Sequence, residues 1–375
     1  MRVLVIGAGA MGIATSWQLA KRGHDVVTCE QFEVNSWIAS SAGSTRTFRM
    51  SYERDEYIRM TQRTLALVAE LEALSGQQLL RQTGLLERGR DPSALAAALA
   101  RHDIEHRFLA TAEIATLFPE LRDDGTQHLF HASGGTMFVP ATLHTQADAA
   151  RALGAEIREH TRVVRVDEHS VGVRAHLENG EMVDADRCVL CPGPWANALL
   201  EPLGLEQPLG PGIAQVTYFE GRGMQNRPAI ASLDEHAVYG HPVPGVGYKL
   251  AYAVGNGADW DPDRRTWDVD LAEQARLVAW AREFMPGLDP TPLSSERHPW
   301  TMTPDVDIIL DQHGPFVIGA GCAGHSFKLG PAIGEILADL CEGVESPLAT
   351  PFSIDRSTLQ GNVDRVALGS GVITS

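Results

Sequence analysis

The scarcest charged side chain in this 375-residue sequence is lysine, which accounts for only three of the 31 basic residues. The three are Lys21, Lys249 and Lys328. A lysine retained among so many arginines suggests a place where a compact ammonium works and a planar guanidinium does not. Lys21 lies in a Lys-Arg-Gly helix end that we expect to be exposed. Lys249 and Lys328 are therefore the candidates for chemistry that involves an anion or a developing negative charge.

A second group of residues with a chemical use is a run of glycines between two apolar segments near the start of the chain. Residues 3–6 predict a buried parallel strand, and a helical pattern then leads to a second strand over 26–29. Such a unit binds a dinucleotide, because the glycines allow a pyrophosphate to approach the helix N-terminus and an acid further on binds the ribose. The negative charge of that acid argues against a 2′-phosphate and hence against NADP. The cofactor-binding candidates here are Gly7, Gly9, Ala10, Met11, Gly12 and Glu30.

Nucleotide-binding signals recur in the middle and near the end of the chain, so the domain that carries them is predicted to be discontinuous. Its parts are residues 1–86, 140–205 and 300–375, whereas residues 87–139 and 206–299 form a second domain rich in Pro, Gly and short strand-like runs. The predicted fold class is α/β (α+β overall), with a Rossmann-type FAD-binding domain and a second, β-rich substrate domain. The interruption favours FAD, because NAD dehydrogenases usually complete the nucleotide fold continuously.

Longer motifs follow one another in a distinctive order. They are Ser40-Ser41-Ala-Gly-Ser-Thr-Arg46-Thr-Phe-Arg49, Gly247-Tyr-Lys249-Leu-Ala-Tyr252, Thr301-Met-Thr-Pro-Asp-Val-Asp-Ile-Ile-Leu-Asp311 and Gly319-Ala-Gly-Cys-Ala-Gly324-His325-Ser-Phe-Lys328. With these motifs, nearly the whole chain resembles the monomeric sarcosine oxidase and N-methyltryptophan oxidase family of FAD-dependent amine oxidases.

The resemblance implies that Arg49 and Lys328 hold the carboxylate of the substrate. Two converging cations orient a small anion by charge-assisted hydrogen bonds and would direct its α-carbon at the flavin N5. The resemblance also implies that Lys249 activates dioxygen, because a desolvated ammonium stabilises superoxide more than it stabilises neutral dioxygen. The alternative for each of these residues is an ordinary structural ion pair.

The resemblance assigns further residues to the cofactor. Arg46 would lie against the isoalloxazine ring, Ser41 would bind the phosphate region or cap a helix, and Val163 would pair with the adenine through its backbone. Trp195 is expected near the cofactor or else in the core, and His325 either faces the flavin or is structural. The cofactor-binding candidates of this group are Ser41, Arg46, Val163, Gly193, Trp195, Gly321, Gly324, His325 and Lys328.

Several positions depart from the family pattern. The cysteine that usually links the flavin is replaced by His298, so we expect non-covalent FAD; a histidyl–flavin bond is chemically possible, but the spacing does not support it. Trp300 replaces a tyrosine and Ala253 replaces a histidine, which reshapes the pocket for a secondary amino acid larger than sarcosine. Cys322 stands where the family has an apolar aromatic residue. The substrate-binding candidates are Arg49, Lys328, Tyr239, Trp300 and His241, the last on the same strand face as Tyr239.

The overall charge and the cysteines exclude other classes of protein. A formal net charge of −17 argues against nucleic acid and anionic membranes as partners. Five cysteines without a repeated CxxC pair indicate neither a zinc site nor disulfides, so we expect no metal and a cytoplasmic location. No apolar run approaches the roughly 20 residues of a membrane span. The expected partners are a small-molecule amine or amino acid and dioxygen, and the expected state is a monomer.

The favoured function is an FAD-dependent oxidase of a secondary (N-methyl or cyclic) amino acid. Hydride would pass to flavin N5, the imine product would be hydrolysed, and dioxygen would be reduced to hydrogen peroxide. The alternatives are an amine dehydrogenase with a non-oxygen acceptor, a biosynthetic tailoring oxidase that acts on a cyclic imino acid, and a flavin-binding subunit without turnover of its own. The last alternative leaves Arg49 and Lys328 unexplained.

Overall fold

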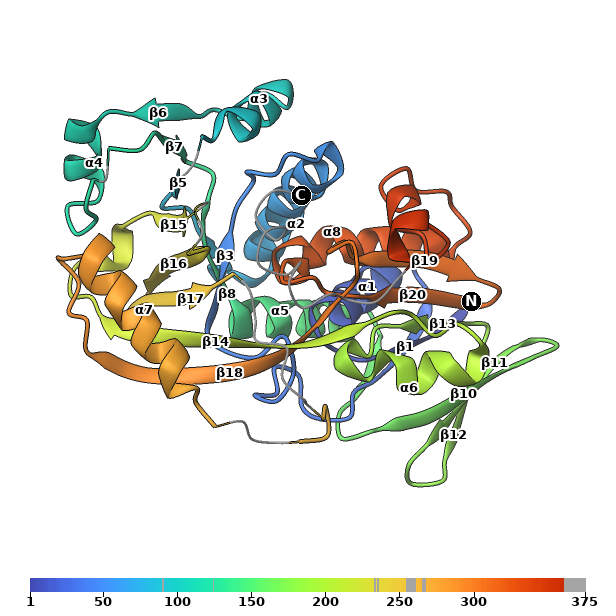
Figure 1. Ribbon diagram of the computed structural model, residues 1–375. Coiled ribbons are helices and arrows are strands. Elements are labelled where there is room, and N and C mark those ends of the chain that lie inside the picture. Colours follow the sequence, from blue (N-terminus) through green and yellow to red (C-terminus); the bar gives the residue numbers. More distant parts are fainter. Residues whose placement is uncertain are drawn as a thin grey trace.

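The structure is a computed structural model that describes residues 1–89, 91–123, 125–232, 234, 236–253, 261–264 and 268–360. Two large sheets dominate it, one mostly parallel and one mixed (Figure 1). The α/β fold class that the sequence predicts is confirmed. In the described part of the chain, every helix is too short or too polar to cross a bilayer.

The first sheet has six strands in the order β19-β20-β13-β1-β2-β9. All neighbours in it are parallel except β19 and β20. The strand bounds are β1 (Arg2–Ile6), β2 (Asp25–Cys29), β9 (Glu156–Arg158), β13 (Arg187–Leu190), β19 (Ile309–His313) and β20 (Phe316–Ala320). Segments from the beginning, middle and end of the chain therefore share one sheet, as the discontinuous domain requires.

Successive residues of β1 belong to two different cores. Val3 and Val5 pack with the helices on one face of the sheet, whereas Leu4 and Ile6 pack with a three-stranded sheet on the other. Because side chains alternate along a strand, an all-apolar strand is buried on both faces. The three-stranded sheet consists of β10 (Val163–His169), β11 (Gly172–Leu177) and β12 (Met182–Ala185).

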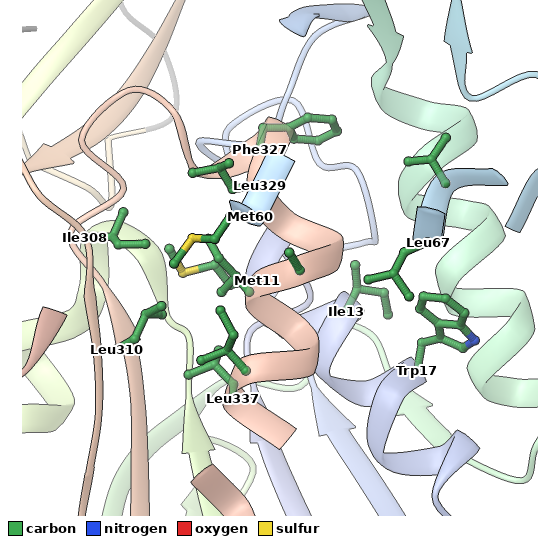
Figure 2. Close-up of a cluster of buried hydrophobic side chains, with 14 of the residues drawn as sticks. Met11, Ile13, Trp17, Met60, Leu67, Ile308, Leu310, Phe327, Leu329 and Leu337 are labelled. Atoms are coloured by element: carbon green, nitrogen blue, oxygen red, sulfur yellow. The ribbon is translucent and has the colours of Figure 1, made fainter. Parts of the chain in front are cut away.

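Four helices form the helical layer of the first sheet. They are α1 (Ala10–Lys21), α2 (Asp55–Ser75), α5 (Val139–Ala152) and α8 (Ser326–Cys341). Side chains of α1, α2 and α8 meet in one buried cluster (Figure 2). Two glycines bring α8 close to α1, since a methyl group on Gly334 would lie 2.4 Å from the carbonyl carbon of Ala14 and one on Gly330 would lie 2.9 Å from the oxygen of Ala10. This contact places the N-terminal turn of α8 beside that of α1.

The second large sheet has eight strands in the order β18-β14-β17-β16-β15-β5-β7-β6. Its strands are β5 (Leu85–Arg88), β6 (Arg107–Leu109), β7 (His128–His131), β14 (Gly210–Glu220), β15 (Ala229–Ser232), β16 (Val238–Val243), β17 (Gly247–Tyr252) and β18 (Pro292–Met302). One face packs against α4 (Thr111–Leu117) and α7 (Leu271–Phe284) through residues such as Phe118, Trp280 and Leu250. The opposite face is left to line a cavity.

The two units meet at a small sheet in the order β3-β8-β4. It consists of β3 (Thr45–Phe48), β4 (Leu80–Arg81) and β8 (Gly135–Phe138). Strand β8 falls in the predicted substrate domain, yet it pairs with two strands of the other unit. The two-domain division remains a proposal, which the membership of the two large sheets supports.

The two remaining α-helices of the described residues are short. They are α3 (Ser93–Arg101) and α6 (Ala196–Leu200).

The end of the described chain is packed. Phe352 and Leu359 are buried, and Arg356 donates to both carboxylate oxygens of Asp305, at 2.6 Å and 3.0 Å. Residues 361–375 of the predicted FAD domain lie outside the described residues.

Candidate active site

Two adjoining cavities lie at the carboxyl ends of the parallel strands. The larger has about 1630 Å³ of empty space, its open mouth included, and the smaller has about 860 Å³. They share five lining residues, so together they form one elongated space. The shared residues are Gly9, Ser40, Ser41, Cys191 and Gly193.

The glycines after β1 shape the junction between the cavities. Gly7 has φ +93°, and a methyl group there would lie 2.3 Å from the oxygen of Cys191. A methyl group on Gly12 would lie 1.9 Å from the oxygen of Gly7, so Gly12 serves helix packing and does not line either cavity. At Gly9 the nearest atom to such a methyl group is the Ser41 hydroxyl, at 3.2 Å. The backbone at Gly9 is therefore open to a close ligand.

The smaller cavity carries the predicted ribose acid. The Glu30 carboxylate accepts hydrogen bonds from the backbone N–H groups of Ala8, at 2.6 Å, and Phe32, at 3.0 Å. Burial raises the pKa of Glu30, and these two donors oppose the shift. Ser41 accepts a hydrogen bond from the N–H of Ala10, at 3.0 Å, at the first turn of α1. Both side chains thus sit where backbone donors gather at a helix N-terminus.

Other predicted cofactor residues line the smaller cavity as well. Val163 and Gly193 are among its lining residues. Trp195 is buried, lines the same cavity and donates from Nε1 to Asp263, at 2.9 Å. Its ring meets Phe32 edge to face. The predicted alternatives for Trp195, cofactor proximity and core packing, are therefore compatible with each other.

Lys249, from β17, lines the larger cavity and is only 2% exposed. Its ammonium donates to the backbone oxygen of Thr45, at 2.6 Å, and lies 5.8 Å from the centre of the Tyr218 ring. Burial, followed by the nearby Arg46 charge, holds the pKa of Lys249 well below its ordinary value. A neutral carbonyl thus holds this ammonium, and its charge is not cancelled by an ion pair within the described residues.

Lys328, in the first turn of α8, and Arg49, just after β3, line the same cavity. Within the described chain, neither forms an ion pair with a carboxylate. Arg49 lies 4.4 Å above the Tyr52 ring, and the buried carboxylate of Glu87 acts on it only from a longer distance. Burial and the charges of Arg49 and Arg46 hold the pKa of Lys328 well below its ordinary value. Two cations that form no ion pair with a described carboxylate therefore face one cavity, which suits a bound anion.

Arg46 also lines the larger cavity, and its guanidinium donates to three backbone oxygens. The acceptors are Thr45, at 3.0 Å, Ser40, at 3.0 Å, and Ala42, at 2.6 Å. These bonds fix the orientation of the guanidinium, and none of the three acceptors carries a formal charge. Burial lowers the pKa of Arg46. Arg46 is consequently a fixed positive element of the cavity wall.

The predicted aromatic candidates also line the larger cavity. Both nitrogens of His241 are already bonded, to the hydroxyls of Thr47, at 2.8 Å, and Thr45, at 2.9 Å. Burial and neighbouring cations hold the pKa of His241 well below its ordinary value, so it is neutral. Tyr239 lies beside it on β16. His241 thus contributes to the cavity wall without a free nitrogen for a substrate.

Trp300 is held between two glycines. A methyl group on Gly212 would lie 1.8 Å from the indole Nε1, and one on Gly324 would lie 2.3 Å from its six-membered ring. The buried indole Nε1 has no hydrogen-bond partner among the described residues. His325 is packed against the rings of Tyr52 and Tyr57, and its Nε2 is likewise buried without a partner. Gly321, Gly324 and His325 all line the larger cavity.

Sequence reasoning missed the residues that hold the predicted ones. Thr45 supports both Lys249 and His241, Thr47 supports His241, and Glu296 bonds to His298, at 3.3 Å. The spacing could have indicated these supporting residues. Residues two apart on a strand point to the same face, and this holds for Thr45 with Thr47 and for Glu296 with His298. Within the described residues, no group of three His, Cys, Asp or Glu could hold a metal ion.

Comparisons with known proteins agree with this geometry. Residues 2–340 match the family model described as FAD dependent oxidoreductase. The chain is 35% identical to the peroxisomal sarcosine oxidase of Homo sapiens, over 94% of this chain and 95% of that protein. It is 30% identical to the monomeric sarcosine oxidase of Bacillus sp. (strain B-0618), over 98% of each. The solved structure of NikD, an unusual amino acid oxidase essential for nikkomycin biosynthesis, matches with a TM-score of 0.83 and 25% identity over 94% of this chain and 96% of that chain.

The residues present fit FAD. An elongated double cavity follows the helix N-terminus, and Gly9 leaves the backbone open there. At the far end lie cations without an ion pair and buried nitrogens without a hydrogen-bond partner, counted over the described residues. The resemblance to the sarcosine oxidase family that the motifs indicate is confirmed. The chain belongs to the FAD dependent oxidoreductase family, and FAD is its cofactor.

Proposed function

We propose that this FAD-dependent oxidoreductase acts on CH–NH groups, as an oxidase of a secondary α-amino acid, N-methylated or cyclic, that uses dioxygen as electron acceptor. Bound FAD supplies a two-electron acceptor for a hydride from the carbon next to the amine. The amine becomes an imine, which water hydrolyses. Dioxygen is reduced to hydrogen peroxide, which is released.

The observation that carries the proposal is the pair of cations in the cavity wall, Arg49 and Lys328, which form no ion pair with a carboxylate among the described residues. Their charges select a carboxylate and fix its position by charge-assisted hydrogen bonds. When the carboxylate is fixed, the α-carbon next to it and the amine on that carbon can adopt only a few orientations. This restriction lowers the entropic part of the activation barrier. A protonated amine has no lone pair with which to assist hydride loss. The substrate must therefore lose a proton first, and the rate should rise with pH.

Lys249 supports dioxygen as the acceptor. Its buried ammonium is held by a neutral carbonyl, so its charge is available to an anion that forms nearby. Reduction of dioxygen creates negative charge where there was none, and a fixed cation stabilises that charge without reorganisation. An enzyme that passes electrons to another acceptor has no need for such a group.

The cavity supports a substrate larger than sarcosine. Small apolar side chains line its sheet face, from Ala214, Val216, Ala231 and Ala253, and leave space beyond the two carboxylate-binding cations. The comparison proteins named sarcosine oxidases are similar in sequence, but Trp300 and Ala253 differ from the family pattern in the wall itself. A cyclic imino acid or an N-methyl amino acid with an apolar side chain fits this space.

We further propose that FAD is bound non-covalently by a monomer. His298 stands at the position of the usual linking cysteine, and Cys322, which also lines the larger cavity, is hydrogen-bonded to the backbone of Thr301. A relative is named monomeric, which supports the monomer. The five cysteines are free, which supports a reducing compartment such as the cytoplasm.

An anaerobic flavin-bleaching screen over N-methyl and cyclic amino acids tests this function. We expect bleaching by a secondary amino acid, recovery of the yellow colour with one equivalent of hydrogen peroxide when air is admitted, and no bleaching by the matching amine that lacks a carboxylate. Bleaching without recovery in air would favour the dehydrogenase. Absence of bleaching by every amino acid would contradict the proposal. Acid precipitation in the same assay should leave a colourless pellet, since a yellow pellet would show a covalent flavin.

A further inference from the structure

A buried histidine and a half-exposed carboxylate connect the larger cavity with solvent. His298 is 8% exposed and lines the cavity, and its Nδ1 is buried without a hydrogen-bond partner among the described residues. Its other nitrogen, Nε2, lies 3.3 Å from Glu296, whose side chain is 44% exposed. The Tyr218 hydroxyl donates to the same Glu296 oxygen, at 3.1 Å. The imidazole thus has one nitrogen inside the cavity wall and the other on a carboxylate that reaches water.

The surroundings of this pair place it on the Lys249 side of the cavity. The charged groups that act on His298 are Glu296 on its own strand, Arg46 from β3 and Lys249 from β17. Tyr218 from β14 contacts Glu296 and lies beneath the Lys249 ammonium. The Tyr218 contacts therefore associate the pair with Lys249 and the proposed dioxygen site.

The remaining groups of the cavity wall leave few routes for a proton. Both nitrogens of His241 are bonded to threonines. Lys249 is held by the Thr45 carbonyl. His325 is packed among aromatic rings, and burial together with three nearby cations, Lys328, Arg49 and Arg54, holds its pKa well below its ordinary value. Among the described histidines of this wall, only His298 has a carboxylate partner that reaches solvent.

We propose that Glu296 and His298 form a proton-transfer pair that carries a proton from solvent into the cavity, where it completes hydrogen peroxide during the reduction of dioxygen. The inference rests on the proposed oxidase function. Two electrons and one proton from the reduced cofactor, together with one proton from the pair, convert dioxygen to hydrogen peroxide. His298 accepts a proton at Nε2 from the Glu296 side and releases one from Nδ1, as the two nitrogens of imidazole allow. Glu296 is a carboxylate between turnovers, so each proton comes from solvent and passes through it, and exchange of the imidazole proton with water returns His298 to its starting tautomer.

The test separates the oxidation of the reduced flavin from substrate chemistry. The flavin of the wild type, of His298→Asn and of Glu296→Gln is photoreduced without any amine and mixed with dissolved dioxygen in a stopped-flow instrument over a series of pH values. We expect reoxidation to be about 10²-fold slower in both variants, the lower end of the effect of losing an acid–base group, and the pH dependence of the wild type to be flattened. Anaerobic reduction by a substrate should keep its pH profile.

A matched control and a second readout exclude a merely structural effect. His176 and Asp167 form a similar pair, at 2.8 Å, on β11 and β10 away from both cavities, so His176→Asn and Asp167→Asn should leave reoxidation unchanged. In NMR titrations, the histidine signal that His298→Asn removes should show a lower pKa in Glu296→Gln, because the hydrogen bond with Glu296 raises the pKa of His298. The FAD content of each variant is measured from its absorbance.

The outcomes are distinguishable from failure of the proposed function. If Glu296→Gln is reoxidised at the wild-type rate across the pH range, the proposed proton-transfer pair is overturned. This holds even if His298→Asn fails to fold or loses FAD. A changed pH profile in substrate reduction with unchanged reoxidation would overturn it too, since the pair would then serve the amine. If the wild-type reduced flavin reacts with dioxygen no faster than free flavin, both the oxidase and the pair are wrong.

Discussion

The two ends of the cofactor space are built in opposite ways. The end beside β1 relies on backbone groups from a short stretch near the N-terminus, namely the N–H groups at the start of α1 and the glycines Gly7 and Gly9, and side chains such as Glu30 and Trp195 complete its wall. The other end is made of side chains from β3, β16, β17, β18 and α8, which are far apart in the sequence. A backbone site is tolerant of most side-chain changes but intolerant of added volume. In a site made of side chains, one substitution can remove one function and leave the others. Single substitutions should therefore separate substrate binding from the reaction with dioxygen.

The largest separation is expected at Lys249. Lys249→Met removes the buried cation and keeps an apolar stem of similar length. Reoxidation of the reduced flavin by dioxygen should slow by about 10²-fold to 10³-fold, the usual effect of losing one electrostatic group that stabilises developing charge. Stopped-flow mixing measures this rate, while FAD content and anaerobic reduction by substrate should change much less. Lys21→Met, at an exposed lysine, is the control. Unchanged reoxidation in Lys249→Met would contradict the assignment and favour a non-oxygen acceptor.

Lys328→Met should instead weaken binding of the substrate. Loss of a hydrogen bond to a charged group costs about 1.5–3 kcal/mol, which is about a 10-fold to 100-fold rise in Kd. The Kd is measured by flavin absorbance with a small aliphatic carboxylate that has no amine. Reoxidation by dioxygen should stay close to the wild type. If Lys328→Met slowed reoxidation as much as Lys249→Met does, the division of tasks between the two lysines would be wrong.

The pH dependence of carboxylate binding sharpens the same contrast. Burial and the charges of Arg49 and Arg46 lower the pKa of Lys328, so its ammonium is lost at a less alkaline pH than that of an ordinary lysine. Protonated Lys328 binds the carboxylate, and affinity must therefore fall as pH rises through this pKa. With an amino acid substrate, loss of the amine proton acts in the opposite direction, which gives a bell-shaped profile. The alkaline fall should vanish in Lys328→Met, and its persistence there would assign it to another group.

At the backbone end, added volume should matter more than charge. Gly7 and Gly180 have similar φ angles, +93° and +88°, but a methyl group meets the Cys191 oxygen at Gly7 and nothing within 4 Å at Gly180. The left-handed conformation alone costs a non-glycine residue about 1–2 kcal/mol. Gly180→Ala should lower the free energy of unfolding by this amount and keep FAD. Gly7→Ala should lose more stability and most of its FAD, as measured by thermal unfolding and absorbance. Equal effects would show that crowding at Gly7 is unimportant.

The same difference explains what the sequence could predict. The glycine unit is contiguous, and each glycine has a local reason, so the strand, turn, helix and Glu30 follow from pattern and elementary sterics. Prediction of the other end of the cofactor space required a comparison of motifs with a known family. The local sequence Gly-Tyr-Lys-Leu does not indicate that Lys249 reaches the carbonyl of Thr45 on another sheet. Side-chain partners such as Glu296 depend on which strands become neighbours. The pairing of β14 with β18, which brings Tyr218 to Glu296, could not be predicted from either strand alone.

The smallest expected effect concerns the shape of the cavity at Trp300. Trp300→Phe shortens an indole that lies between Gly212 and Gly324 and borders the cavity, so it should favour bulkier substrates. The ratio of kcat/KM between a large cyclic or aromatic N-methyl amino acid and sarcosine should rise about fivefold, or about 1 kcal/mol, the lower end of what one methylene contributes in an apolar pocket. Trp280→Phe is the matched control, because Trp280 is also buried, with an Nε1 that has no hydrogen-bond partner in the described part of the chain, but packs on the opposite face of the eight-stranded sheet. Both variants should lose similar stability, and only Trp300→Phe should change the preference. An equal change in both would mean that general loosening of the core, and not the wall of the cavity, sets which substrate is accepted.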